Sequence, residues 1–120
     1  MTSSSSSNDD DVGVKLLLCT VPTTEVAKEI SQALLRKKLC ACINVIPGVR
    51  SFYQWEGTMH DEQEVLLVVK STGLRSDELC NSFVELHPYD VPEVLVLDVE
   101  SGSEAYLKWV RGECLAGFLK

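Results

Sequence analysis

Two consecutive segments of strand-like alternation constrain the fold of this chain more than any other feature. The first covers residues 41–56 and contains Pro47-Gly48, and the second covers residues 58–70 after a turn at Gly57. They predict one long hairpin, with a bulge or bend where Pro47-Gly48 interrupts the alternation. About fifteen strand residues extend about 50 Å, whereas a domain of about 100 residues has a radius of gyration of about 13 Å. We therefore expect the hairpin to extend beyond its own domain as an arm.

The segments on either side of the hairpin complete a recognisable order of elements. Residues 14–21 form a buried apolar run, and residues 24–38 carry apolar side chains at helical spacing. After the hairpin, helical spacing over 75–86 and an apolar run over 94–99 lead to a third, C-terminal helix. The order β-α-β-β-α-β followed by α predicts an α+β fold of the ferredoxin-like type. Such a fold has an antiparallel sheet with helices on one face.

We expect the arm to associate with another copy of the chain. Its outer part carries Phe52, Tyr53 and Trp55, and two short helices cannot cover a sheet of this length. Covering or closing open edges is how natural sheets avoid uncontrolled pairing, so self-association is expected. The alternative is a hairpin that bends sharply at Pro47-Gly48 and folds onto its own domain. Strand length alone does not fix the number of copies.

Composition limits the functions that are open to the chain. It has 120 residues with 11 Lys+Arg against 18 Asp+Glu, a net charge of −7, which argues against a nucleic-acid partner. The apolar runs are far shorter than the roughly 20 residues that cross a bilayer, so no membrane partner is expected. No Ser-His-Asp set or phosphate-binding loop is present, and Arg50 and Asn44 alone do not indicate acyl-phosphate hydrolysis. We therefore expect a binding protein, not an enzyme.

The N-terminal segment and the cysteines indicate a compartment. Residues 1–13 are rich in serine and aspartate and predict a disordered tail before one domain over 14–120. The tail has no apolar stretch typical of a secretory signal, and its aspartates argue against a transit peptide. Five cysteines without a CxxC pair indicate reduced thiols, and Cys40 and Cys42 are expected to be small buried hydrophobes. The expected location is the cytosol.

A cysteine, a histidine and a glutamate are the candidates for metal chemistry. Cys19 ends the first strand just before a helix, where a helix N-terminus favours the thiolate, although a buried core thiol is the alternative. His87 precedes Pro88 at a helix end and could equally cap that helix. Glu93 opens the last strand and could equally be a solvated charge. Together, thiolate, imidazole and carboxylate suit copper or zinc. His60, at the hairpin turn, is expected to be exposed.

Four segments, in this order, carry a resemblance to a known family. They are CACINVIPGVRSFYQWEG (40–57), EVLLVVKST (64–72), ELHPYDVPEV (85–94) and YLKWV (106–110). The chain resembles the CutA divalent-cation tolerance family over about residues 14–113. The resemblance implies a ferredoxin-like fold and a tight homotrimer whose hairpins pair between subunits.

The same resemblance implies two sites. A copper site of bacterial members would correspond here to Cys19, His87 and Glu93. A cleft between subunits would correspond to Trp55, Lys70 and Tyr89, although interface packing explains Trp55 and Tyr89 equally well.

The residues and the resemblance together suggest three alternative functions. The first is a cytosolic homotrimer of divalent-metal response that binds copper or a similar divalent cation. The second is a trimeric small-ligand sensor that resembles the PII signalling proteins. The third is an assembly scaffold without catalysis.

Overall fold

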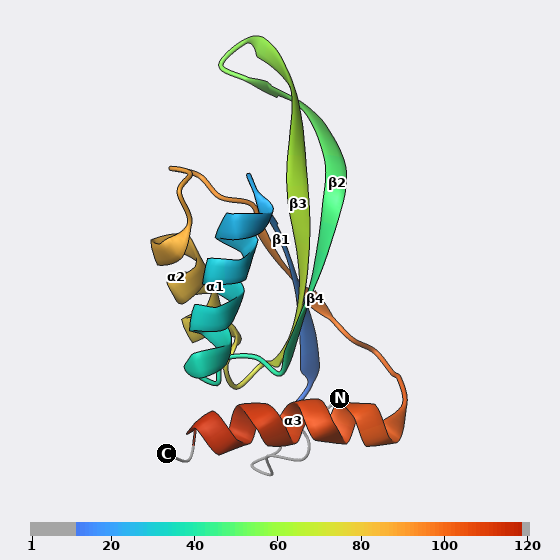
Figure 1. Ribbon diagram of the computed structural model, residues 1–120. Helices are drawn as coiled ribbons and strands as arrows, with labels where there is room; N and C mark the ends of the chain where they lie inside the picture. Colours follow the sequence, from blue (N-terminus) through green and yellow to red (C-terminus); the bar gives the residue numbers. More distant parts are fainter. Residues whose placement is uncertain (1–11, 119–120) are drawn as a thin grey trace.

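The computed structural model describes residues 12–118, so the tail expected over residues 1–13 lies almost entirely outside the described residues. The elements follow the expected order and form one antiparallel sheet with the strand order β2-β3-β1-β4 (Figure 1). They are β1 (Val14–Val21), α1 (Thr24–Arg36), β2 (Cys42–Trp55), β3 (Thr58–Thr72), α2 (Ser76–Leu86), β4 (Val94–Asp98) and α3 (Glu104–Phe118). The ferredoxin-like α+β prediction is confirmed.

The first helix shows how local sequence sets the element boundaries. The Thr23 hydroxyl accepts a hydrogen bond from the backbone N–H of Val26 at 3.1 Å and caps the helix start. Glu25 adds a negative charge in the first turn, where the helix dipole favours it. The helix ends at Arg36, and Lys38 takes a positive φ of 59° that turns the chain back towards the sheet.

The core lies between the helices and one face of the sheet. Leu17 and Cys19 on β1 are fully buried against Phe83 of α2 and Leu34 of α1. Successive strand residues point to opposite faces, so the next residues along β1 and β3 point away from these helices. That second face is also apolar, and it carries Leu16, Leu18, Leu66, Val68, Leu95 and Leu97.

The predicted arm is present. The outer half of β2 and β3 continues past α1 and α2, and the described chain measures 47 × 32 × 24 Å (Figure 1). The β2–β3 register shifts between Ile46 and Val49, which confirms the irregularity predicted at Pro47-Gly48. Gly48 has a φ of +83°, and Gly57 at the turn has a φ of +81°. Both glycines therefore occupy the left-handed region that other residues rarely adopt.

The C-terminal helix crosses the end of the sheet (Figure 1). Val110 and Cys114 of α3 are fully buried, and the Ser71 hydroxyl lies 3.7 Å from the Cys114 sulfur. Trp109 on the same helix is 46% exposed. The helix thus closes one end of the core and leaves an aromatic side chain outside it.

Replacing Gly48 by alanine should destabilise the protein by about 1–2 kcal/mol, because a Cβ strains the left-handed backbone. An added Cβ meets nothing within 4 Å, so the cost is conformational and not steric. Gly112→Ala is the matched control, since Gly112 lies within α3 with open space and alanine should stabilise it by up to about 1 kcal/mol. Denaturant unfolding measures both changes, and equal effects of the two substitutions would contradict the account of the bulge.

Candidate functional site

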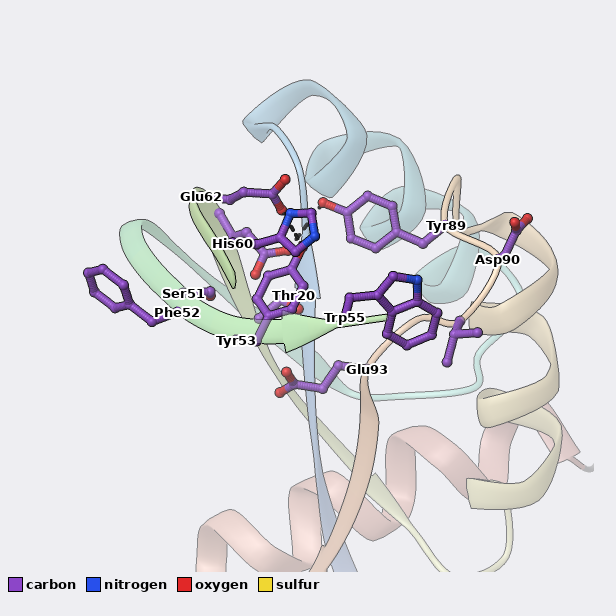
Figure 2. A pocket seen from close by; sticks show the side chains of 12 residues that line it. Thr20, Ser51, Phe52, Tyr53, Trp55, His60, Glu62, Tyr89, Asp90 and Glu93 are labelled. Carbon is purple, nitrogen blue, oxygen red and sulfur yellow. Dashed lines mark hydrogen bonds between the residues drawn. The ribbon is translucent and has the colours of Figure 1, made fainter. Parts of the chain in front are cut away.

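A pocket of about 690 Å³ lies where the arm leaves the domain (Figure 2). The outer parts of β2 and β3 form one side of it, and the connection between α2 and β4 forms the other. Its aromatic lining consists of Phe52, Tyr53, Trp55, His60 and Tyr89. Its acidic lining consists of Glu62, Glu64, Asp90 and Glu93.

The pairing of β2 with β3 places the pocket residues of the arm. Tyr53 lies opposite His60 in the ladder, and their rings stack with centroids 4.9 Å apart. His60 is therefore half-buried, which corrects the expectation that it is exposed at the turn. The Tyr53 hydroxyl donates to Glu62 at 2.7 Å, and this hydrogen bond is the main cause that raises the pKa of Tyr53.

His87 positions the other side of the pocket. Its Nε2 lies 2.7 Å from the carbonyl oxygen of Thr20, and its Nδ1 accepts from the backbone N–H of Tyr89 at 3.0 Å. A carbonyl only accepts, so Nε2 is the donor in this contact and Nδ1 is the acceptor in the other. The ring also packs against Phe83 and Tyr89, with centroids 5.3 and 4.7 Å away. His87 thus fastens the α2–β4 connection to the end of β1.

A buried carboxylate lies at the contact between the two sides. Glu64 is only 7% exposed, and the Tyr89 hydroxyl donates to it at 3.1 Å. Burial, and next the charge of Glu64, raise the pKa of Tyr89 to about 12, so the phenol stays protonated at neutral pH. The pair therefore links the arm to the α2–β4 connection through a charge-assisted hydrogen bond.

The three metal candidates lie at one corner of the domain but do not form an open ligand set. Cys19 pairs with Val94, the residue after Glu93, and His87 contacts the residue after Cys19. Cys19 is fully buried in the core, and both nitrogens of His87 already form hydrogen bonds. Glu93 is exposed and lines the pocket. Among residues 12–118, no group of three Cys, His, Asp or Glu side chains is arranged to hold a metal.

Burial decides between the two interpretations of Cys19. It raises the pKa of the thiol to about 12, and the neighbouring Cys80 and Glu93 add smaller contributions in the same direction. The helix N-terminus therefore does not produce a thiolate here, and the interpretation as a core thiol is confirmed. The donor types suit copper, but in the described arrangement the Cys19 thiol keeps its proton and both His87 nitrogens form hydrogen bonds.

The residues of the expected cleft divide into two groups. Trp55 and Tyr89 line the same pocket (Figure 2). Lys70 lies near the other end of β3, where its ammonium group donates to Asn44 and lies 3.8 Å from the Cys42 sulfur. Within one chain, Lys70 is therefore separate from the other two residues, and a cleft between subunits stays a prediction.

The other residues considered for chemistry are occupied by ordinary contacts. Arg50 donates to both oxygens of Asp61, at 2.7 and 2.8 Å. Asn44 accepts from Lys70. The two residues therefore do not form an anion-binding loop. Along the described part of the chain, no helix has the length and apolar character needed to cross a membrane.

Topology and pocket together define the class: a small α+β protein of ferredoxin-like topology with a pocket of aromatic and acidic lining. The family model described as CutA1 divalent ion tolerance protein matches residues 15–113. The solved structure of the divalent cation tolerance protein (Cut A1) of Thermus thermophilus gives a TM-score of 0.81 at 41% identity. That match covers 83% of this chain and 97% of the other.

Curated relatives agree with this assignment. The divalent-cation tolerance protein CutA of Thermus thermophilus is 42% identical over 97 residues, covering 81% of this chain and 94% of the relative. Human protein CutA is 41% identical over 98 residues, covering 82% of this chain and 55% of the relative. The chain thus spans about half the length of the human relative. It belongs to the CutA1 divalent ion tolerance protein family.

Thiol labelling should follow burial. At pH 8, a thiol with a pKa near 12 has about a thousandfold less thiolate than an ordinary cysteine. Cys19 and Cys40, whose pKa values burial raises to about 12, should therefore react with iodoacetamide only after unfolding, whereas the half-buried Cys42 and Cys80 should react in the native protein. Peptide mapping by mass spectrometry measures the order, and denatured protein is the control. Rapid labelling of Cys19 in the native protein would contradict its placement in the core.

Proposed function

We propose that this chain acts as a cytosolic homotrimer of divalent-cation tolerance, and that it binds copper or a similar divalent ion without catalysis. The family description supplies the connection to divalent ions. Five free thiols suit a reducing compartment such as the cytosol.

The apolar face of the sheet that no helix covers supports the proposed self-association. Leu95 and Leu97 of β4 are 54% and 44% exposed, and they continue an apolar surface that includes Leu16 and Leu18 of β1. Exposing this much contiguous apolar surface is costly in water, and α1 and α2 pack on the opposite face. Other copies of the chain would bury it and shelter the arm. The number three comes from the family resemblance.

A charge placed on this face should break the assembly. We expect a mass of about 40 kDa for three copies of the 13.3 kDa chain, and a loss of that species in Leu95→Asp. Leu35→Asp is the matched control, because Leu35 is 39% exposed on α1 and should keep the wild-type mass. Light scattering at low micromolar concentration measures the mass of the wild type and of both variants. A wild-type mass near that of one chain would contradict the proposal.

The corner formed by Cys19, His87 and Glu93 is the proposed divalent-ion site. The observation that supports it is the convergence of β1, the end of α2 and the start of β4 at the β1–β4 pairing. Binding would require the Cys19 thiol to lose its proton and His87 to release the Thr20 carbonyl. Because metal binding displaces a thiol proton, affinity should rise with pH.

Replacing the thiol tests this site. Cys19→Ser should weaken Cu(II) binding by at least about tenfold, because a hydroxyl is a poor ligand for copper. Cys40→Ser is the matched control, since Cys40 is equally buried and its pKa is also raised to about 12. Competitive titration with a chelator measures the affinities. Equal affinity of the wild type and Cys19→Ser would remove Cys19 from the site.

The pocket favours a second candidate function. Trp55 and Tyr89 share one cavity, as a small-ligand sensor resembling the PII proteins would require. In such a trimer, Lys70 would reach the cleft from another copy.

A further inference from the structure

We propose that the acidic segment of residues 9–11, which consists of three aspartates, binds Arg36, Lys37 and Lys38 at the end of α1 in the same copy of the chain. These three residues, the cationic cluster, are the only run of consecutive cations in the sequence. They lie on the side of the sheet that the helices cover, whereas the proposed assembly buries the opposite face. The cluster therefore stays exposed both in one copy and in the assembly.

The cationic cluster has no countercharge among the described residues. Arg36, Lys37 and Lys38 are all exposed. Along residues 12–118, none of their side chains takes part in an ion pair or a hydrogen bond. By contrast, Lys15 and Arg50 pair with aspartates. In a chain of net charge −7, this concentration of positive charge attracts anionic groups.

The backbone at Lys38 indicates that helix formation alone does not explain the cluster. The N–H groups of Lys38 and Leu39 donate to the carbonyls of Leu35 and Leu34, at 3.0 and 3.2 Å, in the pattern that ends a helix with one left-handed residue. Glycine is the usual residue at that position, but here Lys38 takes the φ of 59°. The helix dipole favours cations in the last turn, yet it does not require a lysine where glycine fits better. An anionic partner accounts for the third cation.

The start of β1 brings the acidic segment close to the cluster. Val14 pairs with Thr72, the last residue of β3. The Ser71 hydroxyl donates at 2.7 Å to the carbonyl of Leu39, which follows Lys38 and leads into β2 on the other edge of β3. About two strand spacings, or about 10 Å, therefore separate the start of β1 from the end of the cluster. Figure 1 likewise shows the start of β1 and the end of α1 at the end of the sheet that α3 crosses.

The acidic segment has the reach and the charge for this contact. Residues 9–11 lie three to five positions before Val14, so an extended chain carries them up to about 10–17 Å from it. That range covers the separation from the cluster within one copy, which favours the segment of the same chain over that of another. Three aspartates match three cations in number and in opposite sign. A network of several charges contributes more than a single exposed pair does.

Zero-length crosslinking of the full chain tests the contact. A carbodiimide joins a carboxylate to a lysine amine with loss of water, and the tryptic peptide of residues 1–15 contains no acidic side chain other than the three aspartates. Crosslinks from this peptide to Lys37 and Lys38 should exceed those to Lys28 at least about fivefold. Lys28 is the matched control, because it is exposed on the same helix, about 14 Å from Lys37, and an eleven-residue segment can reach it. Equal yields at the three lysines would overturn the proposal.

Electrophoresis and salt test the two remaining parts of the proposal. Crosslinks recovered from the gel band of a single chain support a contact within one copy, whereas crosslinks found only in the band of two chains would overturn it. Sodium chloride at about 0.5 M should lower the yield at least about threefold, because salt screens exposed charges. A yield that does not change with salt would contradict an electrostatic contact and overturn the proposal.

Two charge reversals locate the cluster. Arg36→Glu keeps both target lysines but removes one cation of the cluster, so it should lower the crosslinks to Lys37 and Lys38 at least about threefold. Lys28→Glu is the matched control, because it changes the net charge equally at another exposed position of α1, and it should keep the wild-type yield. An equal loss in both variants would indicate attraction by net charge only and would overturn the proposal.

The result is independent of the proposed divalent-ion function. Cys19 and its neighbour in the sheet, Val94, lie near the other end of β1 from the acidic segment. Arg36→Glu should therefore lower the crosslinking yield and keep the copper affinity of the wild type.

Discussion

The unequal lengths of β1 and β3, which pair at the centre of the sheet, determine most of the architecture. β1 has 8 residues and β3 has 15, so the whole of β1 pairs with the inner half of β3 and the outer half continues as the arm. The central strands are apolar on both faces, whereas α1 and α2 pack against one of them. The arm and the uncovered apolar face therefore have a common origin. The arm and the uncovered apolar face are both parts of the β-sheet surface that a single copy does not bury.

The imidazole of His87 connects the core to the pocket. Its two nitrogens hold the end of β1 and the backbone of Tyr89, and Tyr89 in turn donates to Glu64 on the arm. This chain of contacts joins the end of β1, the α2–β4 connection and the hairpin. A metal ligand role for His87 would therefore compete with a positioning role, since the same nitrogen cannot serve both at once.

Much of the fold could be predicted from periodicity, because alternation and helical spacing are local signals. The arm, the bulge at Pro47-Gly48 and the order of the elements are confirmed. The family resemblance indicated Trp55 and Tyr89, but the acidic lining of the pocket could not be predicted, because it depends on which strand faces meet after the bulge shifts the register. Glu64 shows this limit. In sequence it resembles a solvated charge beside a buried strand, and the contact with Tyr89 buries it.

The proposed divalent-ion site combines donors that suit copper with a closed environment. The corner of Cys19 and His87 offers soft donors, but they are closed within the core, so binding there requires a proton to leave and a hydrogen bond to break.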